Sequence, residues 1–323
     1  MTKAAIIDQP GGPDVFRYRD VEVGNPGKGE IRVKHSAIGL NYIDTYHRTG
    51  LYPMKMPLIV GMEGVGTITA IGKGVKDLKA GDRIAYGSGP PGAYAEERVM
   101  PAWLGVKIPK AISDEVGASM MLKGMTAQYL LHSTYKVKKG DTILVHAAAG
   151  GVGLILCQWA RHLGARVIGT VGSDEKAELA KAHGCKHPIV YTRENFVEAA
   201  LKITKGKKLP VVYDSIGAAT FPASLDLLEP RGLFVSFGNA SGPIKAFDAG
   251  ILASKGSLFM TRPSLPHHLL SRKELLKRAE AIVKVVRKGV VKIEVNQRYG
   301  LKDAAQAHIA LESRKTTGSP VLM

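Results

Sequence analysis

Residues 142–176 read TILVHAAAGGVGLILCQWARHLGARVIGTVGSDEK. An apolar run, Ile143 to Val145, is followed by a turn of small residues at 147–153 and then by residues with helical spacing. A Gly-Ala break separates that helix from a second apolar run, Val167 to Val171. The order strand, tight turn, helix, strand predicts one βαβ unit, whose crossover we expect to be right-handed.

The turn has the spacing Ala147-x-x-Gly150-x-x-Gly153, which differs from the usual G-x-G-x-x-G. A glycine turn that enters a helix directs backbone N–H groups, here those of Gly150, Gly151 and Val152, and the positive end of the helix dipole at one point. A glycine cluster alone also fits an ordinary strand-to-helix connection. The strand and the helix on either side of it favour a dinucleotide-binding site.

The end of the second strand discriminates between the two nicotinamide dinucleotides. NAD-selective folds place an Asp or Glu there, which accepts hydrogen bonds from the ribose 2′-OH. This chain has Gly172 and then Ser173, and Lys176 lies one turn into the next helix. A hydroxyl and an ammonium group favour a 2′-phosphate, so the predicted cofactor is NADPH. Ser173 also fits a helix N-cap, with Asp174 and Glu175 in the first turn facing solvent, and both interpretations can hold.

Length and composition indicate a globular protein of two domains. The chain has 323 residues, enough for two ordinary cores. No run approaches the ~18 apolar residues of a membrane span, and the first residues lack the apolar segment of a signal peptide, so we expect a cytoplasmic protein. Two cysteines, Cys157 and Cys185, fit a reducing compartment, and Cys157 is expected to be a small core residue.

The net charge is strongly positive. Lys and Arg number 45 against 28 Asp and Glu, which gives +17. Such a surface attracts polyanions, including nucleic acid and a phosphate-rich cofactor. A solvated basic surface is the simpler interpretation, because no basic motif interleaved with aromatic residues is present.

The order of predicted elements divides the chain into three sections. Residues 1 to about 120 contain many short strands with glycine corners, which suggests a small, partly open barrel. From about 121 to 257 strands alternate with helices, as in a doubly wound parallel sheet. The last section is expected to complete the first domain; it contains strands at 258–261, 291–295 and 320–323, a helix from a capping box at 271–274 to Gly289, and a helix at 303–312.

These parts together resemble the medium-chain dehydrogenase/reductase superfamily, in its zinc-free quinone oxidoreductase (ζ-crystallin-like) branch. The resemblance covers essentially the whole chain. The stretches that carry it are AIGLNYIDTYHRTGLYP (37–53), AGDRIAY (80–86), HAAAGGVGLILCQWA (146–160), VVYDSIG (211–217), GLFVSFGNASG (232–242) and DAAQAHIALESRKTTG (303–318).

The resemblance implies a GroES-like β-barrel catalytic domain at 1–121 and 262–323 and a Rossmann NADPH-binding domain at 122–261. It implies hydride transfer from NADPH to a quinone or another electron-poor conjugated carbonyl. Members are commonly homodimers or tetramers that pair edge strands of their cofactor sheets, and this edge is expected near residues 240–262.

The same resemblance indicates whether the protein is expected to bind zinc. Zinc-dependent relatives place a Cys where this chain has Asn41, and a His before a Glu where it has Met62 and Glu63. An amide and a thioether are poor zinc ligands, so we expect no metal. Without a Lewis acid, substrates that already accept hydride readily are favoured over alcohols.

Site residues follow from the family's motifs. Asn41 is expected near the nicotinamide or its ribose, and Tyr46 and Tyr52 at the quinone site, either as hydrogen-bond donors to the reacting oxygen or as walls that only stack. A loop Asn that caps its own backbone is the other interpretation of Asn41, and His308 is expected to be a packing residue. The remaining expected cofactor contacts are Lys123, Thr126, Gly172, Ser173, Lys176, Tyr191, Ser215, Phe237, Gly238, Asn239 and Arg314.

Three alternatives stay open. The nearest is an enone or 2-enoyl thioester reductase, in which Tyr52 would protonate the substrate α-carbon. An RNA-binding protein with the fold of an enzyme is a second, since some relatives bind AU-rich RNA. A protein that only stores NADPH is the third.

Overall fold

The computed structural model describes residues 1–323 and divides them into two units. The first unit joins both ends of the chain, and the second consists mainly of the segment between them. The first comprises Met1–Met125, His268–Arg287 and Ile293–Met323, and the second comprises Thr126–His267 and Lys288–Lys292. The domain boundaries expected from the sequence stay a prediction.

The second unit contains a six-stranded sheet with the order β11-β10-β9-β12-β13-β14, in which every neighbouring pair is parallel. This is the order 3-2-1-4-5-6 of a doubly wound dinucleotide fold. Its strands are β9 (Thr142–Val145), β10 (Arg166–Val171), β11 (Cys185–Val190), β12 (Leu209–Asp214), β13 (Leu228–Ser236) and β14 (Phe259–Thr261). The predicted βαβ unit and doubly wound sheet are therefore confirmed.

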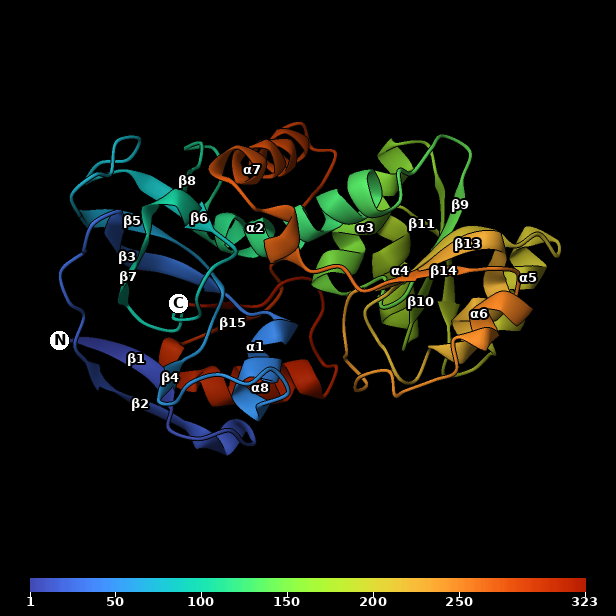
Figure 1. Cartoon of the computed structure of the whole chain (residues 1–323), viewed down its shortest axis with the longest axis horizontal. Coiled ribbons are helices and arrows are strands. Elements are labelled where there is room, and N and C mark those ends of the chain that lie inside the picture. The colour runs from blue at the N-terminus through green and yellow to red at the C-terminus, as the bar shows by residue number, and fades with distance from the viewer. The chain divides into compact units, whose positions relative to one another are not determined.

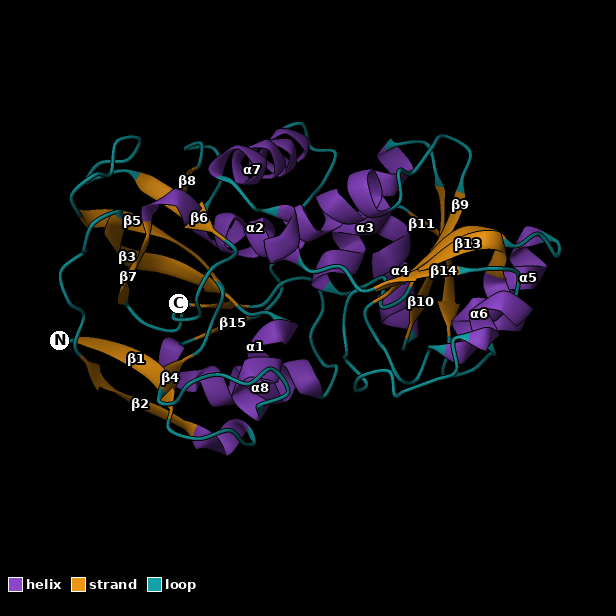
Figure 2. Ribbon diagram, in the orientation of Figure 1, coloured by secondary structure: helices purple, strands orange, loops and turns teal.

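Helices cover both faces of this sheet, with α3 and α4 on one face and α5 and α6 on the other (Figure 2). These helices are α3 (Gly151–His162), α4 (Asp174–Ala182), α5 (Phe196–Thr204) and α6 (Gly250–Ser254). The central strands are buried on both sides and read as continuous apolar runs, as Ile143 to Val145 does at 0% exposure. Cys157 is fully buried in α3, as expected of a small core residue.

The first unit is built from two sheets that are largely antiparallel (Figure 1). A three-stranded sheet has the order β2-β1-β4, and a seven-stranded sheet has the order β15-β16-β3-β5-β6-β8 with β7 paired to β3. The strands are β1 (Thr2–Ile7), β2 (Phe16–Val21), β3 (Glu30–Gly39), β4 (Leu58–Ile59), β5 (Glu63–Ile71), β6 (Arg83–Tyr86), β7 (Glu97–Pro101), β8 (Val106–Lys107), β15 (Arg298–Tyr299) and β16 (Val321–Leu322). Strand β3 alternates along its first part, because Ile31 and Val33 are fully buried between polar neighbours.

The long helices outside the parallel sheet are α1 (Tyr42–Thr49), α2 (Asp114–Tyr129), α7 (Arg272–Arg287) and α8 (Ala304–Glu312). The short helices are η1 (Pro13–Val15), η2 (Ala102–Leu104), η3 (Leu130–Thr134), η4 (Pro222–Leu227), η5 (Leu265–His268) and η6 (Leu301–Asp303). None of the helices combines the length and the apolar character needed to cross a membrane.

The structure corrects one expected element and adds one that the sequence did not predict. The predicted strand at 291–295 does not form, and only Val295 makes an isolated bridge, with Gly318. The amide of Gln158 takes the place of a strand partner, because it bonds both the N–H and the C=O of Lys292, at 2.8 and 3.0 Å. Helix α2 was not anticipated, because its apolar residues surround the axis and leave no one-sided pattern.

Candidate active site

The predicted phosphate-binding turn lies between β9 and α3. Helix α3 starts at Gly151 with Gly150 as its N-cap, and no side chain satisfies the amide groups of its first turn. A helix leaves these amide groups without an intrahelical partner, so they stay available to an anion. Gly150, Gly151 and Val152 are partly exposed. The turn therefore fits the phosphates of a dinucleotide.

Close backbone packing holds this turn in shape. A Cβ on Gly153 would lie 2.2 Å from the Ala147 carbonyl oxygen, so only glycine fits there. Ala147 has a left-handed φ of 53°, and the Ala148 amide donates to Thr170 O at 3.0 Å. The adjacent His146 ring bonds Thr170 Oγ1 at 2.8 Å and Ser224 Oγ at 2.9 Å, which ties the end of β9 to its neighbours.

Two further loops leave the same edge of the sheet, after β12 and β13. Ser215 follows β12, and Phe237, Gly238 and Asn239 follow β13. A Cβ on Gly238 would lie 2.4 Å from Ser215 O, so these loops are in close backbone contact. The carboxyl edge of a doubly wound sheet, near the point where the strand order reverses, is where such folds bind ligands.

The third predicted group surrounds the end of β10. Ser173 caps α4 by accepting a hydrogen bond from the Lys176 amide at 3.3 Å, so the N-cap interpretation is confirmed. The Tyr191 hydroxyl lies over Gly172, 3.0 Å from where a Cβ would be. Gly172, Ser173, Lys176 and Tyr191 are thus brought together at the ends of β10 and β11.

An arginine that sequence reasoning missed compensates the acid in this region. Both Arg193 guanidinium nitrogens bond Asp174, at 2.7 and 2.6 Å. The pair is exposed to solvent, so it contributes little to stability. The Asp174 carboxylate next to Ser173 is therefore paired with a cation.

In the first unit, α1 presents the loop residues of the predicted quinone site. Asn41 is its N-cap residue and is 4% exposed, and Tyr46 is 8% exposed. The Tyr46 and Tyr52 rings meet edge to face with centroids 5.2 Å apart, and the Tyr52 amide donates to Tyr46 O at 3.1 Å. The structure therefore brings the two tyrosines together. Whether they donate to the substrate or only line its site stays a prediction.

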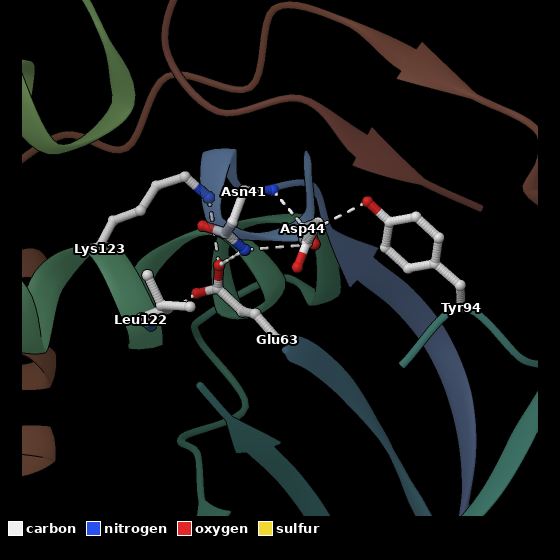
Figure 3. A network of polar contacts seen from close by, with 7 residues as sticks. Asn41, Asp44, Glu63, Tyr94, Leu122 and Lys123 are labelled. Carbon is white, nitrogen blue, oxygen red and sulfur yellow. Dashed lines mark hydrogen bonds and ion pairs between the residues drawn. The ribbon is translucent and has the colours of Figure 1, made fainter. Parts of the chain in front are cut away.

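A buried polar network surrounds Asn41 (Figure 3). Glu63 accepts hydrogen bonds from Asn41 Nδ2 at 2.9 Å, Lys123 Nζ at 3.1 Å and the Leu122 amide at 2.8 Å. Asp44 accepts from the Asn41 amide at 2.9 Å and from the Tyr94 hydroxyl at 3.1 Å. Two residues predicted from distant segments, Asn41 and Lys123, therefore share one carboxylate.

The electrostatics of this network are unusual because its members lack solvent. Burial raises the pKa of Asp44 from 3.8 to about 7, against the opposing effects of the Asn41 amide, the Tyr94 hydroxyl and Lys123. His308, whose Nε2 is 3.1 Å from the Tyr94 hydroxyl, has a pKa lowered by burial from 6.5 to about 3. His308 is fully buried, as expected of a packing residue, but it also bonds a polar partner.

The remaining predicted residues lie as follows. Thr126 is 7% exposed, three residues after Lys123 in α2. Arg314 follows α8 with a left-handed φ of 60° and belongs to the first unit, whereas Lys176 and Tyr191 belong to the second. Its assignment to the 2′-phosphate stays a prediction.

No cluster of three or more His, Cys, Asp or Glu side chains that could hold a metal ion is present. Met62 is 8% exposed, and Asn41 donates its side-chain amide to Glu63, so neither supplies an anionic ligand. The expectation that the protein works without zinc stays a prediction from this donor set.

Comparison with known proteins agrees with both units. The family model described as alcohol dehydrogenase GroES-like domain matches residues 27–110, and the model described as zinc-binding dehydrogenase matches residues 151–276. The quinone oxidoreductase of Pseudomonas aeruginosa is 51% identical over 324 residues, which cover 100% of both chains. The chain belongs to the quinone oxidoreductase branch of the medium-chain dehydrogenase/reductase superfamily.

Other members of this family are similar to the chain over its whole length. A solved structure of Escherichia coli quinone oxidoreductase complexed with NADPH matches with a TM-score of 0.98 at 46% identity, over 99% of each chain. A 2-haloacrylate reductase from a Burkholderia species is 46% identical over 332 residues, 100% of this chain and 99% of the relative. The fold expected from the sequence, a GroES-like domain with a Rossmann sheet, is thereby confirmed.

Proposed function

We propose that this protein is an NADPH-dependent quinone oxidoreductase that transfers hydride to a quinone without zinc. The observation that carries the proposal is the full-length likeness to a quinone oxidoreductase solved with NADPH. The glycine-capped start of α3 supports it, because it offers unpaired amide groups to phosphate.

The cofactor would be held along the carboxyl edge of the parallel sheet. The amide groups of Gly151 and Val152 would bind the pyrophosphate beside Gly150, whose own amide donates to Ala147 O. Ser173, Lys176 and Tyr191 would bind the 2′-phosphate. Ser215, Phe237, Gly238 and Asn239 would approach the nicotinamide half, together with Asn41, Lys123 and Thr126. Arg314 is assigned to the 2′-phosphate by family resemblance alone.

When bound, the nicotinamide supplies a hydride, and a quinone takes up that hydride and a proton. A quinone is electrophilic, so orientation and exclusion of water provide most of the catalysis that the protein must supply. The Tyr46 and Tyr52 rings pack edge to face, and the two residues would line the quinone site, either as donors to the oxygen that gains charge or as walls that only stack.

Steady-state assays with small quinones and NADPH test this function. The expected result is quinone-dependent oxidation of NADPH that exceeds the oxidation of NADH at equal concentration. Absence of quinone reduction, with medium-chain enoyl thioesters reduced instead, would assign the chain to the enoyl reductases.

An enone reductase is the second candidate, because a 2-haloacrylate reductase is 46% identical over the whole chain. In that reaction Tyr52 would protonate the carbon next to the carbonyl group. Tyr52→Phe separates the two functions: enone reduction would fall about 100-fold, as for loss of a general acid, whereas quinone reduction would change little.

Lys176→Ala is expected to weaken NADPH binding about tenfold and NADH binding hardly at all. The reason is that a charge-assisted hydrogen bond to a phosphate contributes about 1.5–3 kcal/mol, and NADH has no 2′-phosphate. Lys181→Ala, an exposed lysine in the last turn of the same helix, is the matched control. Fluorescence titration measures both affinities, and an equal loss for the two cofactors contradicts the 2′-phosphate assignment.

We also propose that two copies pair through the edge of the parallel sheet. Strand β14 is an edge strand, and its Phe259 is 60% exposed. An exposed apolar side chain on an unpaired edge favours association with another strand. Phe259→Lys is expected to shift the protein to a monomer, as measured by light scattering, if this edge forms the dimer.

A further inference from the structure

Glu63 is a fully buried carboxylate of the first unit that accepts hydrogen bonds from three groups. It opens β5, and its side chain is 0% exposed. One oxygen accepts the Leu122 amide and the other accepts both Asn41 Nδ2 and Lys123 Nζ (Figure 3). Gly39 leaves room for the carboxylate, since a Cβ there would lie 2.7 Å from Glu63 Oε2.

Stability alone does not account for this arrangement. Removing a carboxylate and an ammonium from water carries a large desolvation penalty, and apolar residues of similar volume are often as stable as a buried ion pair. Lys123 is itself 7% exposed at its side chain, so both charges bear this penalty. A role in the site explains why the charges are placed there.

The network fixes the direction of two side chains. Asn41 Nδ2 faces two acceptors, Gly39 O at 3.3 Å and Glu63 Oε2 at 2.9 Å, so the amide oxygen must point the other way. The Asn41 backbone is held separately by Asp44. The ammonium group at the end of the long Lys123 side chain is held by the same Glu63 oxygen.

We propose that Glu63 is a positioning residue for cofactor binding and hydride transfer, acting through Asn41 and Lys123. The proposal rests on the proposed function, in which Asn41 and Lys123 contact NADPH. The Asn41 amide then stands where zinc-dependent relatives have a Cys ligand, and Glu63 supplies the charge that keeps the Lys123 ammonium group in place.

A double-mutant cycle tests the proposal with Glu63→Gln, Lys123→Met and the double variant. Displacing reacting or binding groups by about 1 Å can reduce rates about 100-fold. Each single variant is therefore expected to weaken NADPH binding and lower kcat about 10- to 100-fold. Because Glu63 acts through Lys123, the loss in the double variant should be at least tenfold smaller than the product of the single losses.

NADPH dissociation constants from fluorescence titration and thermal midpoints are measured beside kcat and KM. Glu97→Gln is the matched control, because it removes a carboxylate paired with Arg32 in the same unit without contact to Asn41 or Lys123. It should leave NADPH affinity and kcat near wild type. The proposal is overturned if the losses of NADPH affinity and kcat in the double variant equal the product of the single losses. It is also overturned if Glu63→Gln keeps wild-type affinity and kcat.

If Glu63→Gln does not fold, the NADPH affinity of the double variant Glu63→Gln/Lys123→Met is compared with that of Lys123→Met alone. The double variant buries no unpaired ammonium group. Similar NADPH affinities support the proposal, and a further tenfold loss overturns it. Wild-type protein that binds NADPH yet reduces no quinone would refute the proposed function only, because the affinity measurements still test Glu63.

Discussion

Gly153→Ala is expected to weaken NADPH binding at least about 100-fold and to lower the thermal midpoint. The added Cβ would lie 2.2 Å from Ala147 O and 2.9 Å from two backbone atoms of Ala148. All three are backbone atoms, so no flexible side chain can move aside. Ala147 already has a left-handed φ, so the turn has little freedom to relax. The start of α3 must then shift, and its amide groups leave the position that binds phosphate.

The control for this variant is Gly24→Ala, where no atom lies within 4 Å of the new Cβ and the backbone has no left-handed φ. It should retain wild-type affinity and thermal midpoint. Affinity is measured by fluorescence titration of NADPH at a temperature where every variant is folded. A folded Gly153→Ala protein that binds NADPH like wild type would place the cofactor phosphates away from this turn.

The parallel-sheet unit could be predicted from the sequence because its signals are local. Apolar runs such as Val167 to Val171 and the turn at 147–153 lie within one short stretch, and the central strands are buried on both faces. Boundaries are harder to predict, as the start of β11 at Cys185 shows. Its early residues are polar or cysteine, and pairing with β10 decides their conformation.

The polar network of the first unit could not be predicted, because its partners are distant in the sequence. Tyr94 and His308 are separated by 214 positions, and Lys123 and Glu63 by 60. One signal was present: Glu63 is an acid in an apolar, glycine-rich stretch, and a buried carboxylate needs partners. The sequence alone shows that such partners must exist, whereas the fold shows that they are Lys123 and Asn41.

Asp44 and His308 are expected to give the unfolding free energy opposite dependences on pH. The folded-state pKa of Asp44 is raised from 3.8 to about 7, so between these values the folded chain keeps a proton that the unfolded chain releases. Stability from this residue therefore falls as the pH rises from about 4 to about 7. About three pKa units at about 1.4 kcal/mol each correspond to about 4 kcal/mol.

His308 acts in the other direction. Its pKa is lowered from 6.5 to about 3 by burial and then by Arg48, so between these values only the unfolded chain binds the proton. Stability from His308 therefore rises as the pH increases from about 3 to about 6.5, by about 5 kcal/mol. The two contributions to the unfolding free energy oppose each other between about pH 4 and 6.5. The two side chains are linked through the Tyr94 hydroxyl.

Removing one group at a time separates these contributions. Relative to wild type, Asp44→Asn should gain stability as the pH rises from 4.5 to 7.5, and His308→Gln should lose stability from pH 4.5 to 6.5. Urea unfolding at one-unit intervals of pH measures both differences, with Thr49→Ala on α1 as a control that removes no titrating group. Curves for Asp44→Asn and His308→Gln that stay parallel to wild type would mean that neither side chain is held in its neutral form by burial. The opposite slopes of the two differences follow from burial of both groups beside one tyrosine hydroxyl, because desolvation favours the neutral form of each: the protonated acid and the deprotonated imidazole.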